Sequence, residues 1–216
     1  MKVKPKLLDL CCRAGGASVG YASAGFDVTG VDIEPQPDYP YEFHQADAFE
    51  FARNHYREFD AIHTSPHCQG YSAMRFRHKK EYPRQIEEFR EMLLGFRLPY
   101  IIENVEQSPL YDLPLFGNHA ITLCGTMFDL RVYRHRIFES NLPLIAPPHP
   151  SHLTRCARQG KRPSFDGQFV TVTGNCSDVA YARKAMGINW MKRDDLSQAL
   201  PPSYTKFIGE QIKRQL

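Results

Sequence analysis

The sequence contains no pair of cysteines with CxxC spacing. Its six cysteines are scattered along 216 residues, at Cys11, Cys12, Cys68, Cys124, Cys156 and Cys176. A single chain of this length buries a sizeable core without the help of disulfides. A disulfide framework is therefore excluded, and we expect the protein to work in a reducing compartment.

A long apolar run is missing as well. The apolar stretch near the N-terminus is interrupted by Asp9 within a few residues. That stretch is too short for a signal peptide or for a helix that crosses a bilayer. We therefore expect a soluble, cytoplasmic protein with no membrane partner.

An excess of one charge is also absent. The 27 lysines and arginines nearly balance 24 acidic residues, which gives a net charge of +3 and a pI near 8.5. Such a balance permits a nucleic-acid partner without requiring one. Whether the protein binds nucleic acid must therefore be inferred from how the charges are distributed along the chain.

What the sequence does contain is an alternation of short apolar strands with helical segments. The pattern predicts strands over residues 6–12, 26–33, 59–64 and 99–104, and helices over residues 17–24 and 84–96. Alternation of this kind is typical of α/β proteins with a mainly parallel sheet covered by helices on both faces.

The C-terminal half is less regular. Residues 115–139 contain short runs rich in β-forming residues, and residues 141–164 are proline-rich and basic, as expected for a loop. Residues 194–216 return to helical periodicity, with one helix before Pro201-Pro202 and a longer helix after it.

Two features predict an adenosine cofactor. The first strand leads into a glycine turn, Gly15-Gly16, and the second strand ends in Asp32. Glycines let the backbone approach a ligand closely, and a carboxylate accepts hydrogen bonds from both hydroxyls of a ribose. The turn lacks the GxGxxG fingerprint, which disfavours a nicotinamide cofactor. The alternative interpretation is that Gly15-Gly16 form a plain turn and that Asp32 is a solvated acid at a strand end, with no cofactor bound.

A cysteine and a glutamate follow neighbouring strands. Cys68 lies in the loop Ser65-Pro-His-Cys-Gln-Gly70, directly after the third strand, and Glu103 ends the next one. Because parallel strands end at the same edge of a sheet, a nucleophile and an acid would face one cavity. The alternative is that Cys68 is a small buried hydrophobic residue.

A metal site at this loop is another interpretation, because His63, His67 and Cys68 are close in sequence. The H-x-E and P-C-x-x-C motifs of zinc deaminases are absent. We expect no metal, and we interpret His63 as a packing residue inside its strand.

These motifs together resemble those of the DNA cytosine-5 methyltransferases, in the order of that family and over most of the chain. The resembling segments are residues 9–16, Asp32, Asp47, SPHCQGYS at 65–72, IIENV at 101–105, Arg134-His-Arg136 and LPPSYTKFIG from Leu200. The resemblance implies a Rossmann-like class I methyltransferase fold with S-adenosyl-L-methionine as cofactor. The implied cofactor residues are Asp9, Arg13, Ala14, Gly15, Gly16, Asp32, Ile33, Asp47, Ala48, Ser65 and Ser203.

The implied chemistry explains why these residue types are needed. Carbon 5 of cytosine is a poor nucleophile, so Cys68 as thiolate adds to carbon 6, and carbon 5 then attacks the sulfonium methyl group. A protonated Glu103 donates to ring nitrogen 3, which calls for a buried carboxyl with a raised pKa. Arg134 and Arg136 stabilise the thiolate, and one of them holds the O2 oxygen of the base.

The sequence departs from the family at two positions. His67 stands where proline usually precedes the nucleophile, and Arg13 stands where the first loop glycine is expected. His67 is expected to affect the nucleophile loop or the thiolate. The Arg13 side chain would either crowd the cofactor or hold its carboxylate.

Two basic clusters are candidate contacts to DNA. Arg75, Arg77, Lys79 and Lys80 follow the nucleophile among aromatic residues, and Arg155, Arg158, Lys161 and Arg162 lie in the proline-rich loop. Basic grooves with stacking aromatics bind nucleic acid strands, and a cytosine in a duplex must be flipped out to react. The alternative interpretation is that both clusters are solvated basic loops that contact no nucleic acid.

The resemblance divides the chain into three parts. Residues 1–139 form the catalytic and cofactor-binding core, residues 140–169 a much reduced target-recognition insert, and residues 170–216 a C-terminal segment that completes the core. The insert is too short for an independent domain. Methylation of a mononucleotide or RNA, or a catalytically silent DNA-binding module, therefore remain alternatives. We expect a monomer in the cytoplasm of a bacterial or phage-infected cell.

Overall fold

A computed structural model describes residues 3–72, 82–111, 119–158, 161–174 and 176–216. Within these residues one sheet has seven strands: β1 (Lys6–Leu10), β2 (Asp27–Asp32), β3 (Glu42–Gln45), β4 (Ala61–Thr64), β5 (Tyr100–Asn104), β6 (His119–Leu123) and β7 (Arg136–Ser140). Their order is β3-β2-β1-β4-β5-β7-β6. The first five are parallel, whereas β7 runs antiparallel to both β5 and β6.

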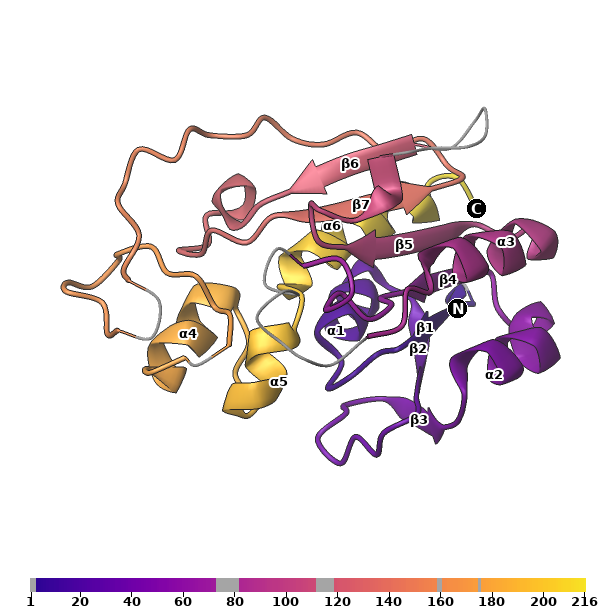
Figure 1. Ribbon diagram of the computed structural model, residues 1–216. Helices are drawn as coiled ribbons and strands as arrows, with labels where there is room; N and C mark the ends of the chain where they lie inside the picture. Colours follow the sequence, from indigo (N-terminus) through magenta and orange to yellow (C-terminus); the bar gives the residue numbers. More distant parts are fainter. Residues whose placement is uncertain (1–2, 73–81, 112–118, 159–160, 175) are drawn as a thin grey trace.

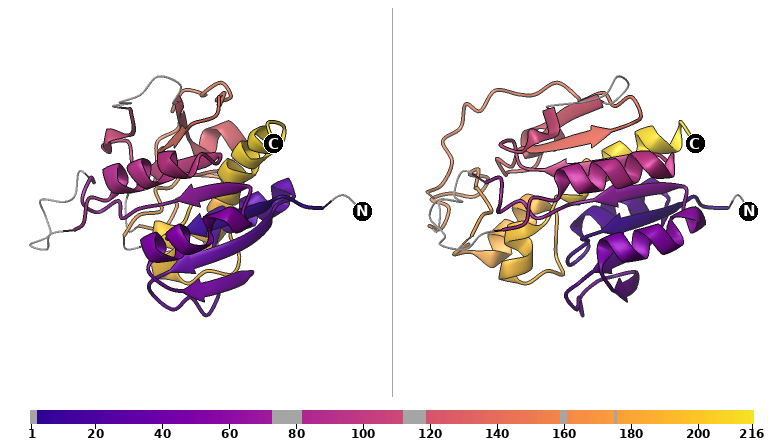
Figure 2. Two further views of the ribbon diagram at one scale, coloured as in Figure 1. Left: turned by 90° about the vertical axis from the view of Figure 1, so that its right-hand side faces the viewer. Right: turned by 45° about the vertical axis from the view of Figure 1, so that its right-hand side comes forward.

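Helices cover both faces of the sheet (Figure 2). The helices are α1 (Gly16–Ala24), α2 (Ala48–His55), α3 (Ile86–Phe96), α4 (Val179–Met186), α5 (Arg193–Gln198) and α6 (Pro202–Lys213), with short 3₁₀ turns at Tyr56–Glu58, Pro109–Tyr111 and Gly125–Phe128. Successive strand residues point to opposite faces. Leu7 packs with α1 and α6, and Leu8 packs with α2 and α3. Burial on both faces explains the continuous apolar runs of the central strands.

Close packing of α1 against α6 fastens the C-terminal helix to the sheet. A Cβ atom at Gly20 would lie 2.0 Å from Thr205 Oγ1, and a Cβ atom at Gly209 would lie 2.9 Å from Ala24 Cβ. The two helices approach this closely only because glycines stand at both positions. This contact places the chain just before α6 beside the loop that follows β1.

The α4 and α5 helices pack away from the sheet, in a third apolar cluster. This cluster joins Val132, Val170, Met186 and Leu196 to Ala14 of the first loop. Residues 170–216 were expected to complete the core; Leu200 and α6 of this segment pack in the cluster that covers the sheet, whereas α4 and α5 pack in the third cluster. Figure 1 shows α4 and α5 beyond the carboxyl ends of the parallel strands, with both termini at the opposite end of the sheet. The connection from β7 starts at that opposite end and runs back past β6 to reach α4.

The described part of residues 141–164 contains no helix or strand, as its proline content predicts, and this irregular stretch continues to residue 178. In the described residues, no helix combines the length and the apolar character needed to cross a membrane.

A buried ion pair links α3 to β7. The Arg90 guanidinium lies 2.7 Å from Glu139 Oε2, with side-chain exposures of 8% and 0%, and Tyr100 donates its hydroxyl to the same carboxylate. The variant Arg90→Ala would leave this carboxylate buried without its countercharge. We expect a loss of about 3–5 kcal/mol in the free energy of unfolding, measured by urea denaturation.

The control is Lys184→Ala, because the Lys184–Asp166 pair is 73% and 79% exposed and exposed pairs contribute little. An Arg90→Ala protein as stable as this control would show that the buried pair does not stabilise the fold.

Candidate active site

The loop that carries Cys68 begins where β4 ends, at the carboxyl edge of the sheet. Asn104, the last residue of β5, donates its side-chain amide to the carbonyl of Pro66 at 3.0 Å. The backbone N–H groups of Tyr71 and Ser72 donate to the Cys68 carbonyl at 3.1 and 2.9 Å. These bonds fix the loop on both sides of the half-buried cysteine.

Glu103 lies beside Arg136 because of the strand register. The antiparallel pairing places Asn104 opposite Ile137 and Glu103 opposite Phe138, so β7 begins where β5 ends. Arg136 Nε lies 3.0 Å from Glu103 Oε1. Burial raises the pKa of Glu103, while Arg136 and a hydrogen bond from Ser65 oppose the rise. A buried glutamate with a raised pKa is what the sequence predicts at this position.

Four of the predicted site residues act on one another electrostatically. Burial raises the pKa of the Cys68 thiol; Arg136 and Arg134 lower it, and Glu103 raises it further. The structure therefore brings Cys68, Glu103, Arg134 and Arg136 together. The two arginines do not outweigh burial, so the thiol remains the favoured form of Cys68 at neutral pH.

Arg134 binds the C-terminal segment through its two terminal guanidinium nitrogens. The Arg134 guanidinium donates to the carbonyls of Val172 and Ser197. The Tyr204 hydroxyl donates to the backbone carbonyl of Arg134. Arg134 Nε is buried and has no hydrogen-bond partner among the described residues. Burial, reinforced by Arg136, lowers the pKa of Arg134 to about 9. In this structure Arg134 therefore holds the segment that precedes α6.

A cavity of about 760 Å³ borders the cysteine loop. Seven of the predicted cofactor residues line it: Arg13, Ala14, Asp32, Ile33, Asp47, Ala48 and Ser65. Four do not: Asp9, Gly15, Gly16 and Ser203. The cavity therefore lies over the ends of β1, β2 and β4 (Figure 1).

Asp32 is held rigidly at the edge of this cavity. Its two carboxylate oxygens accept the backbone N–H groups of Arg13 at 2.9 Å and of Glu34 at 3.0 Å. Arg13 has a left-handed backbone with φ of 48°, which aims its N–H at Asp32. Asp47 caps α2 by accepting the backbone N–H of Glu50 at 2.9 Å.

The predicted glycine turn serves the protein's own packing. A Cβ atom at Gly15 would lie 2.9 Å from Pro40 Cδ, and one at Gly16 would lie 2.6 Å from the Leu200 carbonyl oxygen. The glycines therefore make room for other parts of the chain, and in this structure they do not border the cavity.

Asp9 lies beneath the turn and is completely buried. It accepts a hydrogen bond from the Ser18 hydroxyl. Burial raises the pKa of Asp9 to about 7, although the Ser18 bond opposes the rise. Ser203 lies half-buried near the start of α6.

Searches for related proteins found a match only in structure. No family model matches the chain, and no curated protein matches it. A candidate DNA modification methyltransferase encoded within an E. coli prophage aligns over 98% of this chain and 99% of its own, with 13% identity and a TM-score of 0.59. The Dnmt2 methyltransferase of S. pombe aligns over 98% and 99%, with 11% identity and a TM-score of 0.60. The methyltransferase EhMeth of Entamoeba histolytica aligns over 99% of both chains, with 12% identity and a TM-score of 0.62.

The chain shares the fold of these three proteins. This confirms the Rossmann-like fold class, a mostly parallel sheet with helices on both faces, that the motif resemblance implied.

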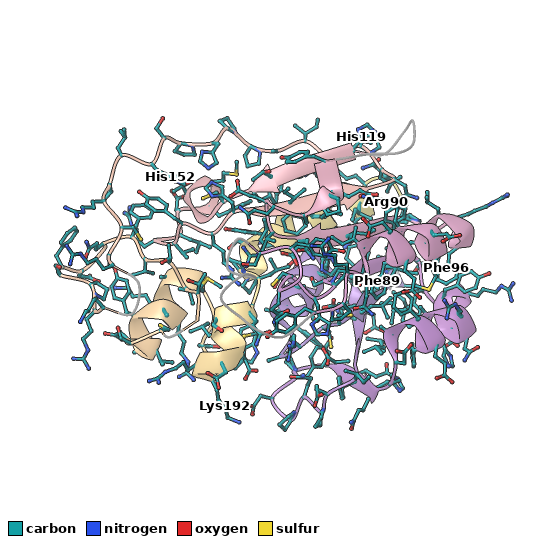
Figure 3. All side chains as sticks on the ribbon, in the orientation of Figure 1. Phe89, Arg90, Phe96, His119, His152 and Lys192 are labelled. Atoms are coloured by element: carbon teal, nitrogen blue, oxygen red, sulfur yellow. The ribbon has the colours of Figure 1, made fainter. Side chains whose placement is uncertain are left out.

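Several residues that line the cavity were not predicted from the sequence. Pro35, Gln36, Pro37 and Asp38 follow Asp32 directly, so adjacency to a predicted ligand was the signal for them. Lys192 also lines the cavity and pairs with Asp38 at 2.7 Å. Nothing in the sequence links Lys192, which lies just before α5 (Figure 3), to a loop more than 150 residues earlier.

His63 is a packing residue, as expected. Its two ring nitrogens face the Tyr21 hydroxyl and the Ser65 hydroxyl, each at 3.0 Å. Burial lowers its pKa to about 3. Both nitrogens are therefore occupied within the protein, which leaves none for a metal shared with His67 and Cys68.

The two basic clusters differ in what the structure describes. Arg75, Arg77, Lys79 and Lys80 lie outside the described residues. Arg155, Arg158, Lys161 and Arg162 are exposed and surround one hollow of about 460 Å³. Four cations around a hollow form a surface suited to an anionic ligand.

Proposed function

We propose that this protein uses S-adenosyl-L-methionine to methylate carbon 5 of cytosine in DNA, through a covalent adduct of Cys68. The observation that carries the proposal is the grouping of Cys68 with Glu103, Arg134 and Arg136 next to the cavity. Sequence motifs and three-dimensional placement agree on these residues, although they come from distant parts of the chain.

The cavity fits the proposed cofactor in size and lining. Pockets for small ligands enclose roughly 300–1,000 Å³, a range that includes this cavity of about 760 Å³. Asp32 would accept the ribose hydroxyls with lone pairs that its two backbone donors leave free. Ile33 is 62% exposed although apolar, so it would gain from contact with the adenine ring. S-adenosyl-L-methionine supplies an electrophilic methyl group when bound.

Cys68 and Glu103 would act on the cytosine ring in concert. The Cys68 thiolate forms a bond to carbon 6, and the electron pair of the 5,6 double bond becomes available at carbon 5. Glu103 holds a proton for ring nitrogen 3, because burial raises its pKa and favours the carboxylic acid. Loss of the carbon 5 proton later restores the double bond and releases the Cys68 sulfur.

Arg136 would position the acid. It pairs with Glu103 and is anchored by donating to the His135 carbonyl at 2.8 Å. Arg134, which holds Val172 and Ser197, would position the segment that precedes α6. Its buried Nε has no partner among the described residues and would be a donor for the base.

DNA is the proposed substrate on the strength of charge and fold. The exposed cluster Arg155, Arg158, Lys161 and Arg162 suits a phosphate backbone. One protein with this fold is described as a DNA modification methyltransferase. The described part of residues 141–169 contains no helix or strand, and so short an insert favours RNA or a mononucleotide as the second candidate.

A substrate comparison tests the proposal. The protein is incubated with methyl-labelled cofactor and duplex DNA, single-stranded DNA, RNA or dCMP, and the nucleosides are then analysed by mass spectrometry. We expect labelled 5-methyl-2′-deoxycytidine from duplex DNA of mixed sequence. Label in RNA or dCMP alone would replace DNA by the second candidate, and label at another atom would contradict the cytosine chemistry.

A further inference from the structure

A cluster of one cysteine and three histidines lies at the end of the sheet formed by β6 and β7. The sulfur or ring-nitrogen atoms of Cys124, His135, His149 and His152 all lie within 4.8 Å of one another. The strand register creates half of this cluster. Leu123 pairs with Arg136, so Cys124, which follows β6, faces His135, which precedes β7. His149 and His152 come from the irregular connection after β7.

The spacing of these atoms is that of a tetrahedral metal site. Zinc bonds of about 2.3 Å to sulfur and 2.0–2.1 Å to nitrogen place neighbouring ligand atoms roughly 3.3–3.6 Å apart. Cys124 Sγ lies 3.4 Å from His152 Nε2, and His135 Nε2 lies 3.1 Å from His149 Nε2. Small side-chain rotations would bring all four atoms around one ion.

Neighbouring groups orient two of the histidines. The other ring nitrogen of His135, Nδ1, lies 3.6 Å from a Glu106 carboxylate oxygen. His152 stacks on Tyr133 with ring centroids 4.0 Å apart, and the Tyr133 hydroxyl donates to the Thr154 carbonyl at 2.7 Å. A carboxylate behind a histidine ligand and a packed ring are the usual supports of metal ligands.

We propose that Cys124, His135, His149 and His152 bind one Zn²⁺ ion that fastens the irregular connection to β6 and β7. Imidazole and thiolate ligands are the set that zinc prefers, and four protein ligands close the coordination sphere, as in structural sites. The ion would tie residues 149–152 to a histidine that stands between Arg134 and Arg136. This site is separate from the cavity and from Cys68.

Metal content and cobalt substitution test the proposal on the full chain. Protein expressed with zinc in the medium is expected to contain one zinc per chain by elemental mass spectrometry. After chelation, titration with Co²⁺ should produce the visible bands of tetrahedral cobalt and a sulfur-to-metal charge-transfer band, both saturating at one equivalent. The melting temperature should fall on chelation and recover with Zn²⁺.

Variants assign the ligands. Cys124→Ser is expected to lose the charge-transfer band, and His149→Ala to bind Zn²⁺ at least about 10-fold more weakly, as metal-site variants commonly do. The matched controls are Cys156→Ser, on the same connection, and His119→Ala, at the far end of β6 (Figure 3). Both should retain one zinc.

Two results would overturn the proposal. One is unmutated protein that contains no zinc and shows no saturable cobalt band. The other is a Cys124→Ser/His149→Ala double variant that keeps one zinc per chain. If a variant unfolds, the cobalt titration of the unmutated chain still decides, because its charge-transfer band requires a thiolate ligand.

Discussion

Cys68→Ala is expected to abolish methyl transfer, with a fall in kcat of at least about four orders of magnitude, as removal of a covalent nucleophile does in other enzymes. Without the sulfur there is no addition to carbon 6, and carbon 5 keeps its low reactivity. Binding of S-adenosyl-L-methionine, measured by calorimetry, should be unchanged, because Cys68 does not line the cavity.

The control is Cys176→Ala, another half-buried cysteine in a loop, which should keep full activity. Substantial transfer by Cys68→Ala would contradict the covalent mechanism. Loss of cofactor binding as well would instead show that Cys68 supports the shape of the cavity.

Glu103→Gln is expected to lower kcat/KM by about 10²–10⁴-fold, the usual contribution of a general acid. The amide keeps the size of the side chain and still accepts a hydrogen bond from Arg136, but it holds no acidic proton for ring nitrogen 3. Glu88→Gln, an exposed substitution on α3, is the matched control and should leave the rate unchanged.

The dependence of kcat/KM on pH separates this role from a structural one. Burial raises the pKa of both Cys68 and Glu103, and the active form requires ionised Cys68 with protonated Glu103. If the cysteine pKa is the higher one, the rate rises up to the pKa of Glu103, stays level, and falls above the pKa of Cys68.

In Glu103→Gln the requirement for a proton on Glu103 is gone. The rate should then rise up to the pKa of Cys68 and show no fall beyond it. A variant that keeps the profile of the unmutated protein at a uniformly lower rate would assign Glu103 a structural role.

The central part of the fold was predictable because burial imposes a pattern on the sequence. The predicted strands at residues 6–12, 26–33, 59–64 and 99–104 contain β1, β2, β4 and β5, which are buried almost throughout. The edge strand β3 escaped prediction, because its four residues are mostly exposed and show no apolar alternation.

The α2 helix also escaped prediction, although its start carries a local signal. Asp47 followed by Glu50 is a typical beginning of a helix, with an acid that caps the first turn. The motif resemblance implied a cofactor-binding role for Asp47. In the structure Asp47 caps α2 and also lines the cavity.

The site was predictable to the extent that it depends on strand ends. Cys68 and Glu103 meet because β4 and β5 are neighbours and parallel. The partners of Arg134 were not predictable, since Val172 and Ser197 reach it only through packing of the C-terminal segment. The Cys124 cluster was missed for a similar reason, because it depends on the antiparallel register of β6 and β7.

The measurement that tests the central claim most directly uses duplex DNA that contains 5-fluorocytosine in many sequence contexts. Fluorine at carbon 5 prevents the final proton loss, so an enzyme of the proposed kind stays attached to the DNA. Incubation with S-adenosyl-L-methionine should give a covalent complex by intact mass. Proteolysis should locate the bond at Cys68, and the mass of the adduct should include one transferred methyl group. Absence of any complex, with cofactor bound and the protein folded, would contradict covalent methylation of cytosine in DNA.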